Sequence, residues 1–158
     1  MITTMKKNFL LISFFYFTFI AYSYGAASST SNTTSNYDKG AYIIKKAKNL
    51  EKKGKHEKAK KKYKKALTYL IKSNTKKPNQ PDTLNYLGFA LRKIGDFEKA
   101  EKYYLIGLSI NPTHNGINEY LGELYLVTNR VDLAKERLEV LKDCNCEEYK
   151  ELKELIDK

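Results

Sequence analysis

The residues of this chain with the clearest capacity for covalent chemistry are its two cysteines, Cys144 and Cys146. Two thiols this close can pair in an oxidising compartment. A Cys-x-Cys bridge closes a very small ring, so we expect it to be strained and more oxidising than an ordinary disulfide. The favoured interpretation is structural, either two partly buried thiols or a local staple, with an intermolecular disulfide and a redox role as alternatives. No third or fourth ligand stands near them, which argues against a zinc site.

No other group of residues has the composition of a catalytic site. The two histidines, His56 and His114, are far apart in sequence, and each stands in a predicted inter-helix turn. Neither has a nucleophile or a cluster of carboxylates nearby, so we expect both to be solvent-exposed turn residues. The sequence therefore predicts a protein without enzymatic activity, cofactor or metal ion.

The charge of the chain is unevenly distributed. Residues 38–77 contain 16 Lys and three acidic residues, a net charge of +13, whereas residues 80–158 have a net charge of −4. The densest part of this basic segment is formed by Lys60, Lys61, Lys62, Lys64 and Lys65. Because these lysines flank an apolar helical stripe, one interpretation is a solvated outer face. The other is an electrostatic patch for an acidic protein, another polyanion or an anionic membrane surface.

Nucleic acid is disfavoured as the partner of this basic segment. The three arginines of the chain all lie outside it, and its tyrosines belong partly to the apolar stripe, which makes them poor stacking platforms for bases.

Helices must position these residues, and residues 81–114 show them most clearly. Leu84, Leu87 and Leu91 recur at the spacing of one helical face, and Gly95 ends that helix. A second helical pattern follows Asp96 and stops at Asn111-Pro112. Small residues at positions 88 and 100 would let the two helices approach closely.

This stretch resembles the tetratricopeptide repeat (TPR), a 34-residue helical hairpin. Leu87-Gly88, Ala100, Tyr104 and Pro112 occupy positions of the family's pattern, although Gly107 replaces the usual Ala and no Trp is present. The pattern recurs, since Leu121-Gly122 follows Leu87-Gly88 after 34 residues. The longer resemblance is to small exported TPR proteins of alphaproteobacteria.

The resemblance implies an all-α, right-handed α-solenoid of three TPR hairpins and a C-terminal capping helix. We expect a TPR domain at 40–158, with repeats at about 40–73, 81–114 and 115–146 and the capping helix at 147–157. Residues 1–25 read as a signal peptide, with a basic start, an apolar run and small residues before the cut, and residues 26–39 as a flexible linker. The expected location is the periplasm after cleavage, and the alternative is an inner-membrane anchor formed by an uncleaved N-terminal helix.

In this family the first helix of each hairpin lines a concave groove that holds an extended peptide or a helix. The resemblance places these residues in it: Asn85, Tyr86, Phe89, Arg92, Glu119, Tyr120 and Glu123. Three of them are aromatic and lie off the leucine stripe, so we expect either exposed binding hot spots or contacts with the neighbouring repeat.

The family's clamp for a C-terminal carboxylate is missing, because Ile44, Tyr86, Gly116 and Tyr120 stand at four of its five positions. The prediction is a non-enzymatic periplasmic adaptor for a protein or peptide of unknown identity. The alternative is a peripheral envelope protein that binds an anionic surface or polymer through the lysine-rich first hairpin.

Overall fold

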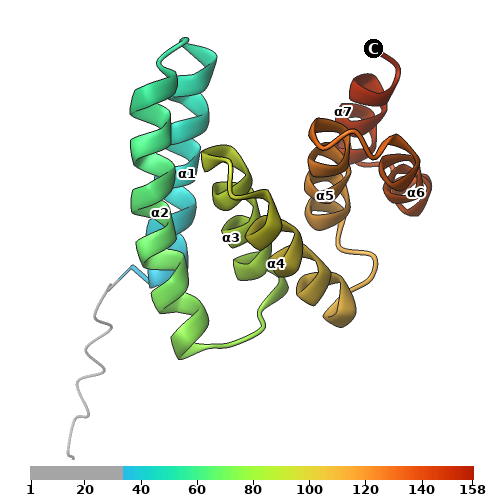
Figure 1. Ribbon diagram of the computed structural model, residues 1–158. Helices are drawn as coiled ribbons and strands as arrows, with labels where there is room; N and C mark the ends of the chain where they lie inside the picture. Colours follow the sequence, from blue (N-terminus) through green and yellow to red (C-terminus); the bar gives the residue numbers. More distant parts are fainter. Residues whose placement is uncertain (1–33) are drawn as a thin grey trace, which may run out of the picture. The chain divides into compact units, whose positions relative to one another are not determined.

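The structure, a computed structural model, describes residues 34–158. Within this range all regular structure is helical, which confirms the predicted all-α fold (Figure 1). The seven helices of the described residues are α1 (Asn36–Lys52), α2 (His56–Lys76), α3 (Pro81–Ile94), α4 (Phe97–Ile110), α5 (Asn115–Val127), α6 (Val131–Leu141) and α7 (Glu147–Ile156). The predicted signal peptide, residues 1–25, and the start of the predicted linker lie outside the described residues.

The first helix begins inside the segment expected to be a linker, residues 26–39. The Asp38 backbone N–H donates to the Ser35 hydroxyl over 3.1 Å, and the Ser35 N–H donates to the Asp38 carboxylate over 3.2 Å. This capping box satisfies backbone donors that the start of a helix otherwise leaves unpaired. The repeat domain therefore starts at Asn36 rather than at residue 40.

Helices that follow one another in the chain form antiparallel hairpins. Helix α1 packs on α2, α3 on α4 and α5 on α6, so three hairpins are present, as predicted. Neighbouring hairpins contact each other through α2 with α3 and through α4 with α5, and α7 covers α5 and α6. Helix α2, with 21 residues, is the longest of the described helices.

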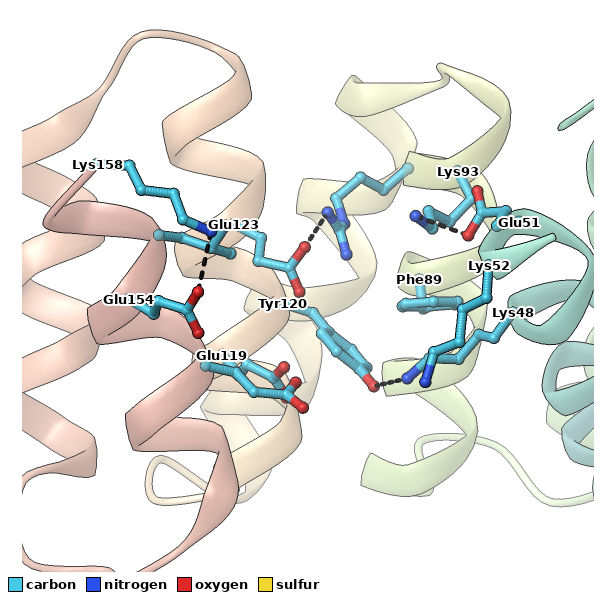
Figure 2. Close-up of a pocket in the computed structure, with 13 residues that line it drawn as sticks. Lys48, Glu51, Lys52, Phe89, Lys93, Glu119, Tyr120, Glu123, Glu154 and Lys158 are labelled. Carbon is cyan, nitrogen blue, oxygen red and sulfur yellow. Dashed lines mark hydrogen bonds and ion pairs between the residues drawn. The ribbon is translucent and has the colours of Figure 1, made fainter. Parts of the chain in front are cut away.

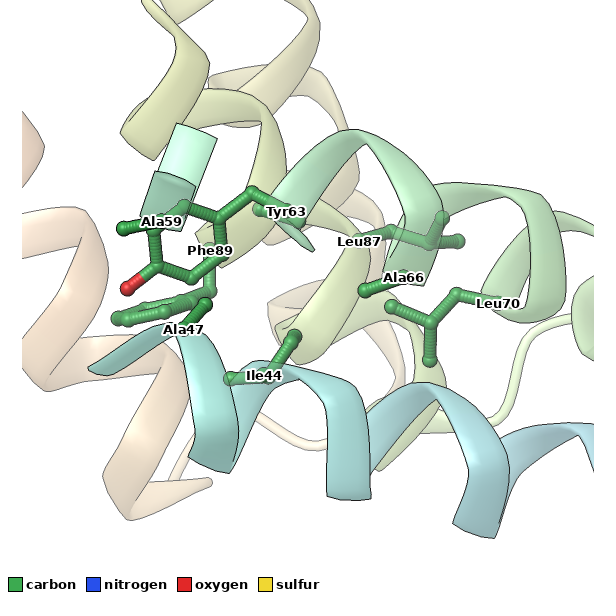
Figure 3. Packing of buried hydrophobic residues seen from close by; sticks show 9 residues of the cluster. Ile44, Ala47, Ala59, Tyr63, Ala66, Leu70, Leu87 and Phe89 are labelled. Atoms are coloured by element: carbon green, nitrogen blue, oxygen red, sulfur yellow. The ribbon is translucent and has the colours of Figure 1, made fainter. Parts of the chain in front are cut away.

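The apolar faces of these helices form two clusters of buried residues. The first joins α1, α2 and α3 and includes Ile44, Tyr63, Leu70, Leu87 and Phe89 (Figure 3). The second joins α3 to α6 and includes Leu91, Tyr104, Ile117, Leu121 and Ala134. The first helix of each hairpin is thus covered on its apolar side by a neighbouring hairpin. Its other side is left to form a surface.

The turns inside the second and third hairpins have the same backbone conformation. Gly95 has φ 93° and Asn129 has φ 59°, and both values are left-handed. Asn suits position 129 because it tolerates this conformation better than most residues do. The equivalence of the two hairpins therefore extends to their turns.

Gly88 permits the close approach of α3 and α4. A Cβ atom at position 88 would meet the ring of the fully buried Tyr104, at 2.7 Å from its Cδ1. A Cβ atom at Gly122 would instead meet the side-chain end of Leu152 on the terminal helix α7, at 2.8 Å from its Cδ1. An aromatic ring held on all sides has less freedom to move away than a leucine side chain.

We expect Gly88→Ala to lower the free energy of unfolding by about 1–2 kcal/mol, because overpacking outweighs the better helix propensity of alanine. Gly122→Ala, the matched control, should lower it by less. Urea denaturation followed by circular dichroism measures both, and an equal or larger loss for Gly122→Ala would contradict the explanation.

Candidate functional site

Side chains of α1, α3, α5 and α7 line a cavity of about 320 Å³ (Figure 2). The first helix of each hairpin contributes, because its apolar side faces the core and its other side faces the cavity. From α3 and α5 the lining residues are Phe89, Arg92, Lys93, Glu119, Tyr120 and Glu123. We call this cavity the groove.

Five of the seven residues predicted for the groove line it, and two do not. Tyr86 lines an adjoining cavity of about 660 Å³ beside α1, which shares Lys48, Lys52 and Tyr120 with the groove. Asn85 is buried and points its amide towards Gly116 at the start of α5. The one-residue step from Asn85 to Tyr86 turns the side chain about a quarter of the way around the helix, from the contact with α5 to the cavity side.

Phe89 is not the exposed aromatic residue that the hot-spot expectation required. It is 2% exposed, and its ring packs against Tyr63 on α2 and Tyr120 on α5, with ring centroids 5.7 and 4.6 Å apart. The alternative interpretation, contact with neighbouring repeats, describes Phe89 correctly. Tyr120 is half-buried and forms the accessible aromatic part of the groove.

Lysines of α1 approach this aromatic floor from one side. Lys48 Nζ donates to the Tyr120 hydroxyl over 3.5 Å and lies 5.4 Å from the ring centroid of Phe89. Lys52 lines the same cavity. Figure 2 shows both lysines on the α1 side of Tyr120, opposite Glu119 and Glu154.

Two ion pairs hold α1, α3 and α5 together at the groove. Arg92 Nη1 lies 2.6 Å from a carboxylate oxygen of Glu123, and the side chain of Arg92 is only 6% exposed. Lys93 Nζ lies 3.0 Å from the carboxylate of Glu51. Arg92 and Glu123 therefore already pair with each other, although Nε and Nη2 of Arg92 have no hydrogen-bond partner.

Glu119 is the most perturbed acidic group of the groove. It is 3% exposed, and one of its carboxyl oxygens has no hydrogen-bond partner. Burial, a hydrogen bond with Glu151 and the charges of Glu123 and Glu151 raise the pKa of Glu119 to about 9. At neutral pH the Glu119 carboxyl therefore holds a proton.

The capping helix α7 belongs to the groove, which the sequence analysis did not foresee. Its Glu151, Glu154 and Leu155 line the cavity. Leu155 is 40% exposed at the cavity, whereas Leu152 on the same helix is fully buried. Helix α7, expected only to cover the end of the repeat domain, therefore also supplies an acidic side of the groove.

The lysine patch lies on α2, which contributes no residue to the groove. Lys60, Lys61, Lys64 and Lys65 are exposed and Lys62 is half-buried. None of these five forms an ion pair with a described residue. The patch and the groove are therefore separate candidate surfaces.

The cysteines and histidines serve the connections between helices. Cys144 and Cys146 are joined by a disulfide in the segment between α6 and α7, with Cα atoms 5.2 Å apart.

His56 is exposed, but His114 is not the free turn residue that was expected. Its Nδ1 accepts from the Ile117 N–H at the start of α5, and its Nε2 lies 3.1 Å from the Asp82 carboxylate. His114 therefore caps α5 and ties it to α3.

The described residues contain neither a metal-binding cluster nor a membrane-spanning helix. No three His, Cys, Asp or Glu side chains are grouped so that they could hold a metal ion. No helix there combines the length and the apolar character needed to cross a membrane.

The family model for the tetratricopeptide repeat matches residues 81–114, which comprise α3, α4 and their turn. Residues 81–114 therefore form a tetratricopeptide repeat. The matched stretch is the one whose pattern the sequence analysis compared with this family, and the hairpins on either side repeat its geometry. No curated protein sequence matches the chain.

Several solved structures resemble this chain in fold. The CopN–Scc3 complex contains a chain 19% identical, with a TM-score of 0.50, and the match covers 84% of this chain and 80% of that one. The type III secretion translocator chaperone SycD of Yersinia enterocolitica is 19% identical, with a TM-score of 0.49, covering 76% and 87%. The first TPR of Spaghetti (RPAP3), bound to an HSP90 peptide, is 20% identical, with a TM-score of 0.47, covering 78% and 94%.

Proposed function

We propose that this protein is a non-enzymatic adaptor that binds a segment of another protein in the groove. The observation that carries this proposal is the groove itself, a cavity of about 320 Å³ formed jointly by α1, α3, α5 and α7. An aromatic side chain, Tyr120, lies between lysines of α1 and glutamates of α5 and α7. Apolar surface beside charges of both signs suits a peptide or helix better than it suits a small reactive substrate.

The proposed place of action is the periplasm of a bacterium. The support is the sequence pattern of residues 1–25, whose apolar run and small residues suit a cleaved signal peptide. The disulfide between Cys144 and Cys146 suits the same oxidising compartment. An uncleaved N-terminal helix would instead hold the repeat domain at the inner membrane.

Site-specific photocrosslinking in the native cells tests the groove. A benzophenone amino acid replaces Lys52 at the groove or, as the comparison site, Lys64 on α2. We expect position 52 to yield a discrete protein adduct that position 64 does not. Tyr120→Ala should abolish the adduct, and the matched control Tyr69→Ala on α2 should retain it. An adduct that survives Tyr120→Ala would move the binding site away from the groove.

A second candidate function is binding of an anionic surface through the lysine patch. The observation in its favour is that the patch lysines of α2 have no acidic partner in the described residues, while Ile71 on the same helix is 51% exposed. Each lysine close to an anionic membrane contributes about 1 kcal/mol at low salt.

Cosedimentation with phosphatidylglycerol vesicles separates the two functions. Surface binding predicts retention that is lost at high salt and in the triple variant Lys60→Glu, Lys61→Glu, Lys64→Glu. The control makes the same charge change at Lys102, Lys135 and Lys142, which lie on α4, α6 and the end of α6. Equal retention of both triple variants would exclude a specific role for the patch.

A further inference from the structure

The charges that line the groove are only partly paired with one another. Arg92 pairs with Glu123, Lys93 with Glu51, and Lys158 with Glu154. Once these pairs are set aside, Lys48 and Lys52 on α1 and Glu119 and Glu151 on α5 and α7 have no ion-pair partner among the described residues. The groove therefore has a basic pole and an acidic pole with Tyr120 between them.

The acidic pole differs from an ordinary surface cluster because one of its carboxyl groups is buried. Glu119 lines the cavity, is 3% exposed and has a carboxyl oxygen without a hydrogen-bond partner. Burying a carboxyl group without a charged partner costs free energy. Such a cost is offset when a partner supplies the missing positive charge.

A basic side chain is the ligand group that fits this position. The guanidinium of Arg or the ammonium of Lys could donate to both Glu119 and Glu151. The face of Tyr120 would lie beside its stem, where cations and aromatic rings attract each other. The lysines of α1 would at the same time repel a basic residue from the opposite pole, so they would set the orientation of the bound segment.

We infer that the groove recognises its partner by a Lys or Arg side chain that enters between α5 and α7 and pairs with Glu119 and Glu151. This inference rests on the proposed function, because it names the chemistry of the segment that the groove binds. It assigns Glu119 the central role and makes Glu151, on the capping helix, part of the recognition surface.

Binding of this kind couples to proton release. The pKa of Glu119 is raised to about 9 mainly by burial and by the hydrogen bond to Glu151, so the free groove holds one proton there at neutral pH. The titratable and charged groups that face Glu119 are Lys48 on α1, Arg92 on α3, Tyr104 on α4, Tyr120 and Glu123 on α5, and Glu151 on α7. A cation paired with Glu119 favours the ionised carboxylate, and the proton leaves as the basic side chain arrives.

The test selects random displayed peptides on the immobilised full chain and measures the selected peptides by calorimetry. We expect them to contain Lys or Arg, and norleucine in its place should weaken binding about thirtyfold or more. With Glu119→Gln most of this preference should be lost, because only Glu151 remains to pair with the basic side chain, whereas the exposed control Glu98→Gln on α4 should keep it. Comparison of two buffers with different ionisation enthalpies should show release of about one proton for the unchanged chain and none for Glu119→Gln.

Two other results would overturn the inference, and they differ in their consequence for the proposed function of the groove. In the first result, the selected peptides lose binding with Tyr120→Ala, but either they do not need Lys or Arg or they keep their full preference for a basic residue with Glu119→Gln. This result would contradict the role of Glu119 and leave the groove as the binding site. If no selected peptide depends on Tyr120, the proposed groove function fails and this inference fails with it.

Discussion

Replacing Arg92 with methionine should lower the free energy of unfolding by about 3–5 kcal/mol, the usual cost of removing one partner of a buried ion pair. The side chain of Arg92 is 6% exposed and that of Glu123 is 22% exposed, and the two join α3 to α5 over 2.6 Å. Methionine fills a similar volume but leaves the Glu123 carboxylate without a counter-charge beside the already crowded carboxyl groups of the groove. Urea denaturation at neutral pH and moderate salt measures the loss.

A double variant separates the unpaired charge from the lost packing. Arg92→Met with Glu123→Gln removes both charges, so most of the lost stability should return. A single variant that loses less than about 1 kcal/mol would show that solvent reaches the pair and that it behaves as a surface ion pair.

Glu119→Gln should stabilise the protein above neutral pH and flatten the dependence of its stability on pH. The pKa of Glu119 rises from 4.5 to about 9 on folding because the carboxyl is buried and faces Glu151 and Glu123. The folded state therefore binds a proton that the unfolded state releases, and the free energy of unfolding falls as pH rises from about 4.5 to about 9. Below about pH 4.5 both states hold the proton, and this contribution to stability is fully present.

Thermal unfolding at about pH 5, 7 and 9 measures this dependence. The melting temperature of the unchanged chain should fall across the series more steeply than that of Glu119→Gln, and the gap between the two should be widest at the highest pH. Glu98→Gln, which removes a carboxylate from the exposed side of α4, is the control and should follow the unchanged chain. Parallel curves for all three proteins would show that Glu119 is ionised in the folded state.

The helices and hairpins were predictable from the sequence because their determinants are local. Apolar spacing at Leu84, Leu87 and Leu91 marks the buried face of α3, and the left-handed turn at Gly95 ends it. Asn129 could be matched to Gly95 because few residues tolerate that backbone conformation. The same regularity indicated which helices would line a groove, and five of the seven predicted residues do line it.

Local patterns were less informative at the ends of helices. The start of α1 at Asn36 depends on the reciprocal bonds between Ser35 and Asp38, inside a stretch whose composition resembles a linker. His114 reads as a turn residue, yet its two ring nitrogens bond to the Ile117 N–H and to Asp82, a residue 32 positions earlier in the chain. The second of these contacts exists only after α3 and α5 have packed together.

The sequence by itself determined the fold class, the repeat, the turns and the side of each helix that faces the groove, since all of these follow from the periodicity of neighbouring residues. Only the tertiary structure decided what each position on that side does. Phe89 and Glu119 share the face of the groove, but Tyr63 and Tyr120 bury the first, and burial opposite Glu151 keeps a proton on the second. Periodicity gives the direction of a side chain, whereas its exposure and its charge depend on which distant helix covers it.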